Sequence, residues 1–271
     1  MTAADQDRRL RLSALEFDVL TEHLGLERMP LVLKVPSPGR TRAERAELVD
    51  AVWRSLADRD LGGPTRLDPE LEGMLRLLVR PDREVDARLW LDRSVRVLAA
   101  AGPVDDAVLV VKDEDELTFR PAAASGLARE AVSVLPALPA GSGGSVSVPS
   151  ADLDAAAEEA GDDLERLPTA LVRRGVRADD AETLARMVNG VGSRGQFGVA
   201  ARDRWGRRTR AGHVVGCFDT PHGRYAQLRR ESPSGQPWST IAPADARRLT
   251  AHVEELLAEV TDGLPGPTPF T

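Results

Sequence analysis

Cysteine is nearly absent from this chain of 271 residues, and Cys217 is its only thiol. A single cysteine excludes an intrachain disulfide and a metal cluster held by several thiolates. Long apolar runs are also missing, because no window approaches the ~18 consecutive apolar residues that a membrane-spanning helix needs. The charged N-terminus, residues 1–11, has no apolar signal segment behind it. We therefore expect a globular protein of the reducing cytoplasm, without membrane insertion.

Lysine is rare, occurring only at Lys34 and Lys112, so the positive charge is almost wholly arginine. The net charge is −7 and the pI is about 5.3. This acidity disfavours nonspecific binding to nucleic acid or to an anionic membrane. One local exception surrounds Trp205, and it consists of Arg202, Arg204, Arg207, Arg208 and Arg210. Such a run could stack a base or grip phosphates, but the overall acidity favours a solvated hairpin tip, and we predict no nucleic-acid partner.

The polar residues form no recognisable catalytic or metal-binding set. The histidines His23, His213, His222 and His252 are not spaced to place two ligands on one helix face. His213 and Cys217 fall on one predicted strand, roughly 13 Å apart, which is too far for a nucleophile and its base. The glycine-rich residues 141–144 lack the strand, helix and lysine of a phosphate-binding loop. We predict no catalytic residue, no metal and no cofactor.

Hydrophobic periodicity divides the chain into two series of helices and strands. Helical spacing predicts helices over 14–24, 42–58 and from about 68, and period-two alternation predicts about four antiparallel strands over 84–120. In the first of these strands, Val85, Ala87 and Leu89 lie on the apolar side, and Glu84 and Asp86 lie on the other. A helix over 121–135 and a linker over 136–150 follow. The second series has helices near 151–160, 162–174 and 178–189, strands over 194–240 and a closing helix.

The two series look like an internal duplication. Phe119-Arg-Pro121-Ala122 aligns with Ile241-Ala-Pro243-Ala244 at an offset of 122, with matching apolar spacing afterwards. Chance remains open, because proline at a helix start is common. The prediction is an α+β fold in which two similar halves pack about a pseudo-twofold axis. We place the halves at 12–138 and 150–260 within one composite domain, 1–271, and expect a disordered tail over 261–271.

The strongest pattern lies in the second series of strands. It comprises Gln196-Phe197-Gly198, the turn Gly206-Arg207-Arg208, Phe218-Asp219-Thr220, Gly223-Arg224-Tyr225, and Trp238 and Pro243 before the last helix. Together with Leu15-Glu16-Phe17-Asp18-Val19-Leu20 and Leu24-Gly25, this ordered set resembles the EspG family of actinobacterial type VII (ESX) secretion proteins. The resemblance implies a central antiparallel sheet flanked by helical bundles. It also implies a cytosolic chaperone that binds the PPE-type protein of a PE/PPE pair and delivers it to the ESX machinery.

The first hypothesis is therefore an interaction protein whose sheet and C-terminal helices cover an apolar tip of the partner. Candidate contact residues are the apolar and aromatic members of the second meander and its flanks: Phe197, Val199, Trp205, Val215, Phe218 and Trp238. Each also has an interpretation as a core residue. Two alternatives stay open, a hydrolase or transferase with a site between the halves and a regulatory module that binds a small ligand. The oligomeric state stays open as well.

Overall fold

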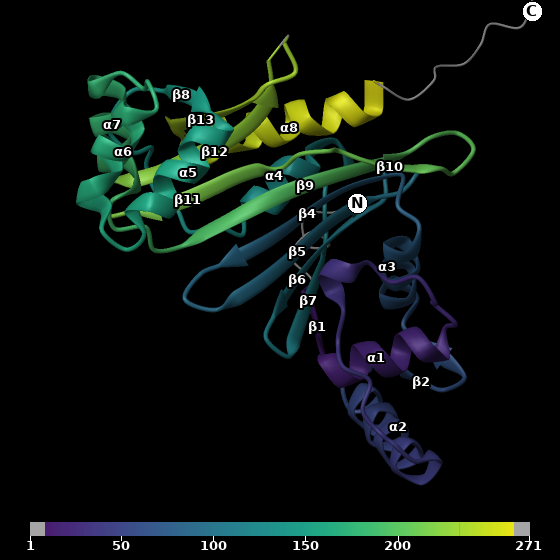
Figure 1. Cartoon of the computed structure of the whole chain (residues 1–271). Helices are drawn as coiled ribbons and strands as arrows, with labels where there is room; N and C mark the ends of the chain where they lie inside the picture. Colours follow the sequence, from purple (N-terminus) through teal and green to yellow (C-terminus); the bar gives the residue numbers. More distant parts are fainter. Residues whose placement is uncertain (1–8, 233, 263–271) are drawn as a thin grey trace, which may run out of the picture. The chain divides into compact units, whose positions relative to one another are not determined.

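The computed structural model describes residues 9–232 and 234–262, which form two compact units (Figure 1). The first unit comprises residues 9–87, 93–131 and 200–209, and the second comprises residues 88–92, 132–199 and 210–262. Strands β4 (Arg83–Trp90) and β9 (Arg194–Arg202) contribute residues to both units.

In the first unit the strands follow the order β1-β7-β6-β5-β4. Their bounds are β1 (Leu10–Ser13), β5 (Ser94–Ala101), β6 (Ala107–Asp113) and β7 (Glu116–Pro121). Pairing is antiparallel from β1 to β7, β6 and β5. The tight connections place Asp92, Asp105 and Glu114 at positive φ, a conformation that aspartate tolerates in turns. Smaller strands are β2 (Gly62–Gly63), β3 (Arg66–Leu67) and β10 (Arg208–Arg210), which pairs with β9.

The helices of the first unit are α1 (Ala14–His23), η1 (Leu31–Leu33), α2 (Arg42–Ala57), α3 (Pro69–Val79), η2 (Ala124–Gly126) and α4 (Leu127–Val132). The last residue of α4, Val132, falls in the second unit. Side chains cap the start of α1, α2 and α3. At α1, the Ser13 side chain accepts from the Glu16 amide and the Glu16 carboxylate accepts from the Ser13 amide. Asp68 caps α3 in front of Pro69, where proline costs no hydrogen bond.

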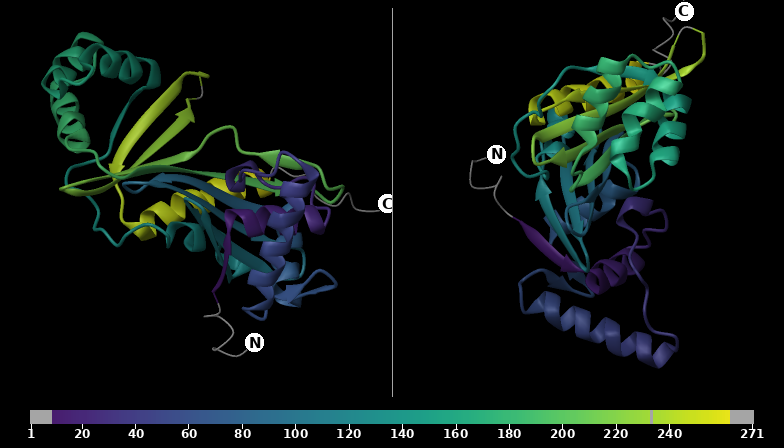
Figure 2. Two further views of the ribbon diagram at one scale, coloured as in Figure 1. Left: turned by 90° about the horizontal axis from the view of Figure 1, so that it is seen from below. Right: turned by 60° about the vertical axis from the view of Figure 1, so that its left-hand side comes forward.

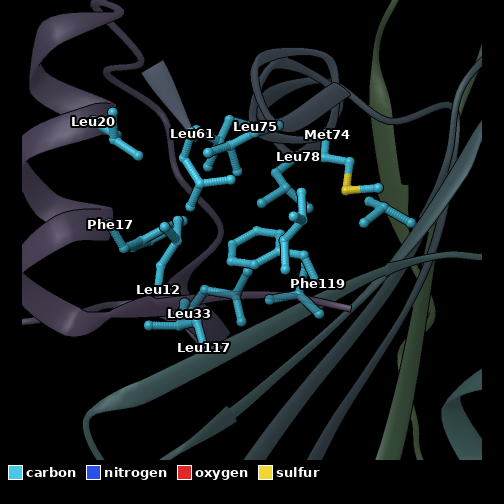
Figure 3. Close-up of a cluster of buried hydrophobic side chains, with 14 of the residues drawn as sticks. Leu12, Phe17, Leu20, Leu33, Leu61, Met74, Leu75, Leu78, Leu117 and Phe119 are labelled. Atoms are coloured by element: carbon cyan, nitrogen blue, oxygen red, sulfur yellow. The ribbon is translucent and has the colours of Figure 1, made fainter. Parts of the chain in front are cut away.

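The core of the first unit lies between the helices α1, η1, α2 and α3 and the strands β1, β5, β6 and β7 (Figure 3). Phe17 of α1 and Phe119 of β7 have ring centroids 6.1 Å apart, and Leu75 and Leu78 of α3 are fully buried. The apolar residues of α1, α2 and α3 therefore pack into one cluster, as their helical periodicity predicts. One departure is that Glu84 and Asp86, on the expected polar side of β4, are also buried.

In the second unit the strands follow the order β8-β13-β12-β11-β9. Their bounds are β8 (Val146–Pro149), β11 (Val215–Thr220), β12 (Gly223–Glu231) and β13 (Pro237–Pro243), all paired antiparallel. The helices are α5 (Ser150–Ala160), η3 (Leu164–Arg166), α6 (Leu167–Arg173), α7 (Ala178–Val188) and α8 (Ala246–Asp262). Helices α5, α6 and α7 lie together beside β8 and β13 (Figure 2).

A buried arginine organises the middle of the second unit. Arg224 on β12 is fully buried and pairs with Asp219 on β11 through Nε and Nη2, at 2.7 and 2.9 Å. Its Nη2 also donates to the carbonyl of Pro136 at 3.0 Å, and its backbone bonds Pro139 and Gly141. Arg224 thereby holds the segment between α4 and β8 against the sheet.

The fold class is confirmed, because both units combine helices with antiparallel strands. The strand orders also correspond, since β1-β7-β6-β5-β4 and β8-β13-β12-β11-β9 both pair the first strand of a series with its last. The half-repeats at 12–138 and 150–260, the single composite domain and the pseudo-twofold axis stay predictions.

Three local expectations need correction. The helix predicted over 121–135 is only η2 and α4, and Pro121 ends β7 instead of opening a helix. The predicted linker contains strand β8 and is bonded to Arg224. Residues 261 and 262 of the predicted tail continue α8, and residues 263–271 lie outside the described part of the chain.

We predict that Asp219→Asn destabilises the protein by about 3–5 kcal/mol, because it leaves the buried Arg224 guanidinium without a countercharge. Urea unfolding followed by circular dichroism measures the change. The control is Asp154→Asn, whose exposed pair with Arg229 should be worth less than about 1 kcal/mol. Equal effects of the two substitutions would contradict the anchoring role of Arg224.

We also predict that Gly141→Ala costs about 1–3 kcal/mol, the usual range for overpacking. A Cβ at this position would lie 2.1 Å from Cζ of Tyr225, whose hydroxyl donates to the Ser142 carbonyl at 3.0 Å. Gly144→Ala is the matched control, because its Cβ would meet no atom within 4 Å. Thermal unfolding of both variants checks this, and an unchanged melting temperature for Gly141→Ala would show that this segment does not pack as described.

Candidate partner-binding surfaces

The described residues do not bring together a catalytic or metal-binding group. No cluster of three or more His, Cys, Asp or Glu side chains able to hold a metal ion occurs among residues 9–232 and 234–262. His213 lies in the bend before β11, not on the strand as predicted, and its Nε2 is 3.6 Å from a Glu259 oxygen. Within the same part of the chain, no helix is long and apolar enough to cross a bilayer.

Cys217 is a core residue of the second unit. It is 5% exposed and faces Ala226 across the β11–β12 pair. Burial raises the pKa of its thiol to about 12, against a smaller opposing effect of the Arg224 charge. At neutral pH almost no thiolate forms, so Cys217 is a poor nucleophile.

Two hollows lie on the surface, and charged side chains line most of both. One, with a volume of about 510 Å³, borders α5, η3 and α6 and is lined by Glu159, Asp163, Glu165, Arg166, Thr169 and Arg173. There Glu159 accepts from Arg173 and Arg174 at 2.8 and 2.7 Å, and the Arg174 hydrogen bond is the main cause of its lowered pKa. The carboxylate is thus occupied by surface ion pairs.

The six predicted contact residues separate into two groups. Four side chains are buried in the free protein: Phe197, Val199, Val215 and Phe218. For these the interpretation as core residues agrees with their burial, and Phe218 stacks on Tyr225 with ring centroids 5.4 Å apart. The other two are at the surface, Trp205 with 64% and Trp238 with 37% of its area exposed.

Trp238 belongs to one face of the sheet in the second unit. Cross-strand partners in register point to the same face, and the register pairs Trp238 with Arg230 and Thr240 with both Leu228 and Ser147. We call this set the open sheet face: Ser147, Leu228, Arg230, Trp238 and Thr240. The next residues along β13, Ser239 and Ile241, are buried on the opposite face.

The helices cover these two faces unequally. On the face of Ile241, the core includes residues of α5, α6 and α7. On the face of Trp238, α8 packs against β11 through its buried apolar stripe and reaches Arg230 through Glu255, at 2.9 Å. The pKa of Glu255 is lowered, first by this Arg230 hydrogen bond and also by His252. The ion pair between Glu255 and Arg230 therefore lies where α8 borders the open sheet face. Arg230 is the cross-strand partner of Trp238 on this face.

Sequence reasoning found Trp238 but missed the rest of this face. Ser147 was assigned to the linker, although Val146-Ser-Val148 has the period-two alternation of a strand. The hydroxyl oxygens of Ser147 and Thr240 are 2.7 Å apart, and this contact fixes the register at this end of the sheet. That alternation is the signal that could have identified β8.

Trp205 belongs to a second surface, the hairpin tip, which comprises residues 203–207 between β9 and β10 (Figure 1). The Asp203 side chain accepts from the amides of Trp205 and Arg207, at 2.9 and 2.8 Å. Gly206 has a φ of +79°, which a glycine adopts without strain. The predicted tight turn after Trp205 is thus confirmed, and the Arg204 guanidinium lies 4.1 Å from the Trp205 ring centroid.

Comparisons with known proteins connect this geometry to a family. The family model described as the EspG family matches residues 13–255. The solved structure of the Mycobacterium tuberculosis type VII secretion system chaperone EspG5, in complex with a PE25–PPE41 dimer, is similar with a TM-score of 0.72 and 16% sequence identity. The match covers 95% of this chain and 97% of that chain, and it shows a shared fold. A search of curated proteins found no match.

We predict that Cys217 resists a thiol reagent at pH 8 in the folded protein and reacts at once in urea. Its pKa of about 12 leaves roughly one molecule in 10⁴ as thiolate at that pH. Labelling with dithionitrobenzoate, monitored by absorbance, measures both rates. Fast labelling of the folded protein would contradict the buried position of Cys217.

Proposed function

Because the chain belongs to the EspG family, we propose that it is a cytoplasmic chaperone of type VII secretion that binds the PPE-type protein of a PE/PPE pair. The observation that carries this proposal is the family match over residues 13–255. The likeness to EspG5, a chaperone solved with a PE–PPE dimer, supports the same class of partner. We propose no enzymatic activity, which agrees with the chaperone role of EspG5.

The physical purpose of such a complex is to cover apolar surface. A helical substrate with an apolar tip aggregates when that tip is exposed to water. A partner that binds only the folded substrate also stabilises it in proportion to the logarithm of the partner concentration. The chain's charge of −7 helps the resulting complex to stay dispersed.

We place the contact for the apolar tip on the open sheet face. Trp238 supplies a rigid aromatic side chain that is already 37% exposed, and Leu228 lies diagonally across the strand pair. Aromatic residues with polar neighbours are typical of the energetic centre of an interface. Arg230, Ser147 and Thr240 supply the polar rim around them.

The open sheet face is too small to be the whole contact. A stable pair of proteins buries on the order of 1,200–2,000 Å² in total, which is more than five side chains supply. The exposed Leu164 of η3 and Val172 of α6 belong to the helical layer on the opposite face of the sheet. We therefore expect the rest of the contact to come from residues that border Trp238 on its own face.

We predict that the protein forms a stoichiometric complex when co-expressed with a PE/PPE pair from its own genome, and that Trp238→Ala weakens this complex at least about tenfold, as the loss of a central aromatic does. Size-exclusion chromatography detects the complex and calorimetry measures its dissociation constant.

The matched control is Leu31→Ala, which removes a side chain that is 80% exposed in the first unit. It should leave the dissociation constant within about twofold. If no PE/PPE pair forms a complex with the protein, the chaperone proposal is wrong. A complex that tolerates Trp238→Ala would leave that role intact and move the contact away from the open sheet face.

A further inference from the structure

The hairpin tip is held by hydrogen bonds but exposes an aromatic side chain, and folding of the first unit does not explain this exposure. Arg202 anchors it, because Nη1 donates to the Gly206 carbonyl at 3.0 Å and Nε donates to the Pro81 carbonyl at 3.1 Å. The Arg202 backbone amide also donates to the backbone carbonyl of Asp82 at 2.7 Å. A turn held in this way loses little conformational entropy when it binds a partner. Yet the tip exposes 64% of a tryptophan.

Positive charge is in excess around this turn, although the Asp82 and Asp203 carboxylates also border it. The Arg80 guanidinium lies against the tip, since a Cβ on Gly206 would be 1.9 Å from its Nη2. Arg80 and Arg207 are exposed, and neither has an ion-pair or hydrogen-bond partner for its side chain within the described residues. Arg208, by contrast, is neutralised by Glu84. The Asp203 carboxylate accepts from two backbone amides.

A hollow at the tip combines this charge with an aromatic wall. It has a volume of about 470 Å³ and is lined by Arg80, Asp82, Arg202, Asp203, Arg204, Trp205 and Gly206. Arginine forks bind carboxylates with two parallel hydrogen bonds. The Arg204 guanidinium covers one face of the Trp205 indole ring, and the rest of the ring can pack against an apolar side chain. The chemistry that fits is a carboxylate next to an apolar residue.

We propose that the hairpin tip recognises an acidic segment of the partner protein, with Asp or Glu beside an apolar side chain, through Arg80, Arg207 and Trp205. This inference rests on the proposed function, because the segment belongs to the same partner. An acidic polypeptide fits better than nucleic acid, because a molecule of charge −7 repels a long polyanion. A short acidic segment meets only the local positive field of the tip.

The test uses the full-length protein and its PE/PPE pair. Arg80→Gln combined with Arg207→Gln should slow association and weaken binding about fivefold to tenfold at low ionic strength, and the difference from wild type should shrink as salt is added. Trp205→Ala should weaken binding by a similar factor at all salt concentrations, because it removes apolar contact. Surface plasmon resonance gives the rate constants and the salt dependence.

The control is Arg40→Gln combined with Arg42→Gln, which removes the same charge from exposed residues at the start of α2. It should retain the wild-type rates to within about twofold. If the complex forms and the tip variants bind as wild type does, the tip inference is overturned and the chaperone proposal stands. If the wild-type protein forms no complex, both fail.

A single-stranded oligonucleotide is the further probe. Retention of this oligonucleotide by the wild-type tip but not by Trp205→Ala, together with unchanged affinity for the PE/PPE pair, would overturn the inference in favour of nucleic acid.

Discussion

The buried ion pair between Arg224 and Asp219 is the constraint on which the second unit depends. A guanidinium with no exposed surface needs a countercharge, or the fold loses several kcal/mol. Asp219 supplies the charge and Pro136 supplies a carbonyl. Backbone bonds from the same residue reach Pro139, Gly141 and Ala244. One residue therefore fixes the β11–β12 hairpin, the segment before β8 and the approach to α8.

That constraint also accounts for the candidate binding surface. Once residues 136–141 are held on the sheet, the next strand, β8, pairs with β13 and ends the sheet of the second unit. Helices α5, α6 and α7 then contribute to the core on one side, while α8 packs on β11 on the other. Trp238 and its neighbours remain accessible because α8 reaches Arg230 through a single ion pair at their border.

Local signals in the sequence predicted the elements well, and long-range pairing decided what they missed. The helical spacing of apolar residues and the turn residue Gly206 act within a few residues, so helices α1 and α3 and the hairpin were expected. Burial of Glu84 depends on Arg208, which is 124 residues away, and no local period reveals such a partner. The segment over 136–150 looked like a linker because its composition favours loops, whereas its structure is set by Arg224. Among the candidate contacts, alternation favoured the core for Phe197 and the adjacent turn favoured exposure for Trp205, and the burial of both agrees. No local pattern separated buried Phe218 from exposed Trp238.

We attribute binding of the partner to a rigid surface of the second unit. The most direct test replaces Trp238 with the photoreactive residue benzoylphenylalanine and irradiates the protein bound to its PE/PPE pair. We expect a covalent product with the PPE-type protein, identified by mass spectrometry. The account would be contradicted if a bound complex gave no product from position 238 while a probe at the exposed Val104, on the β5–β6 turn, cross-linked instead.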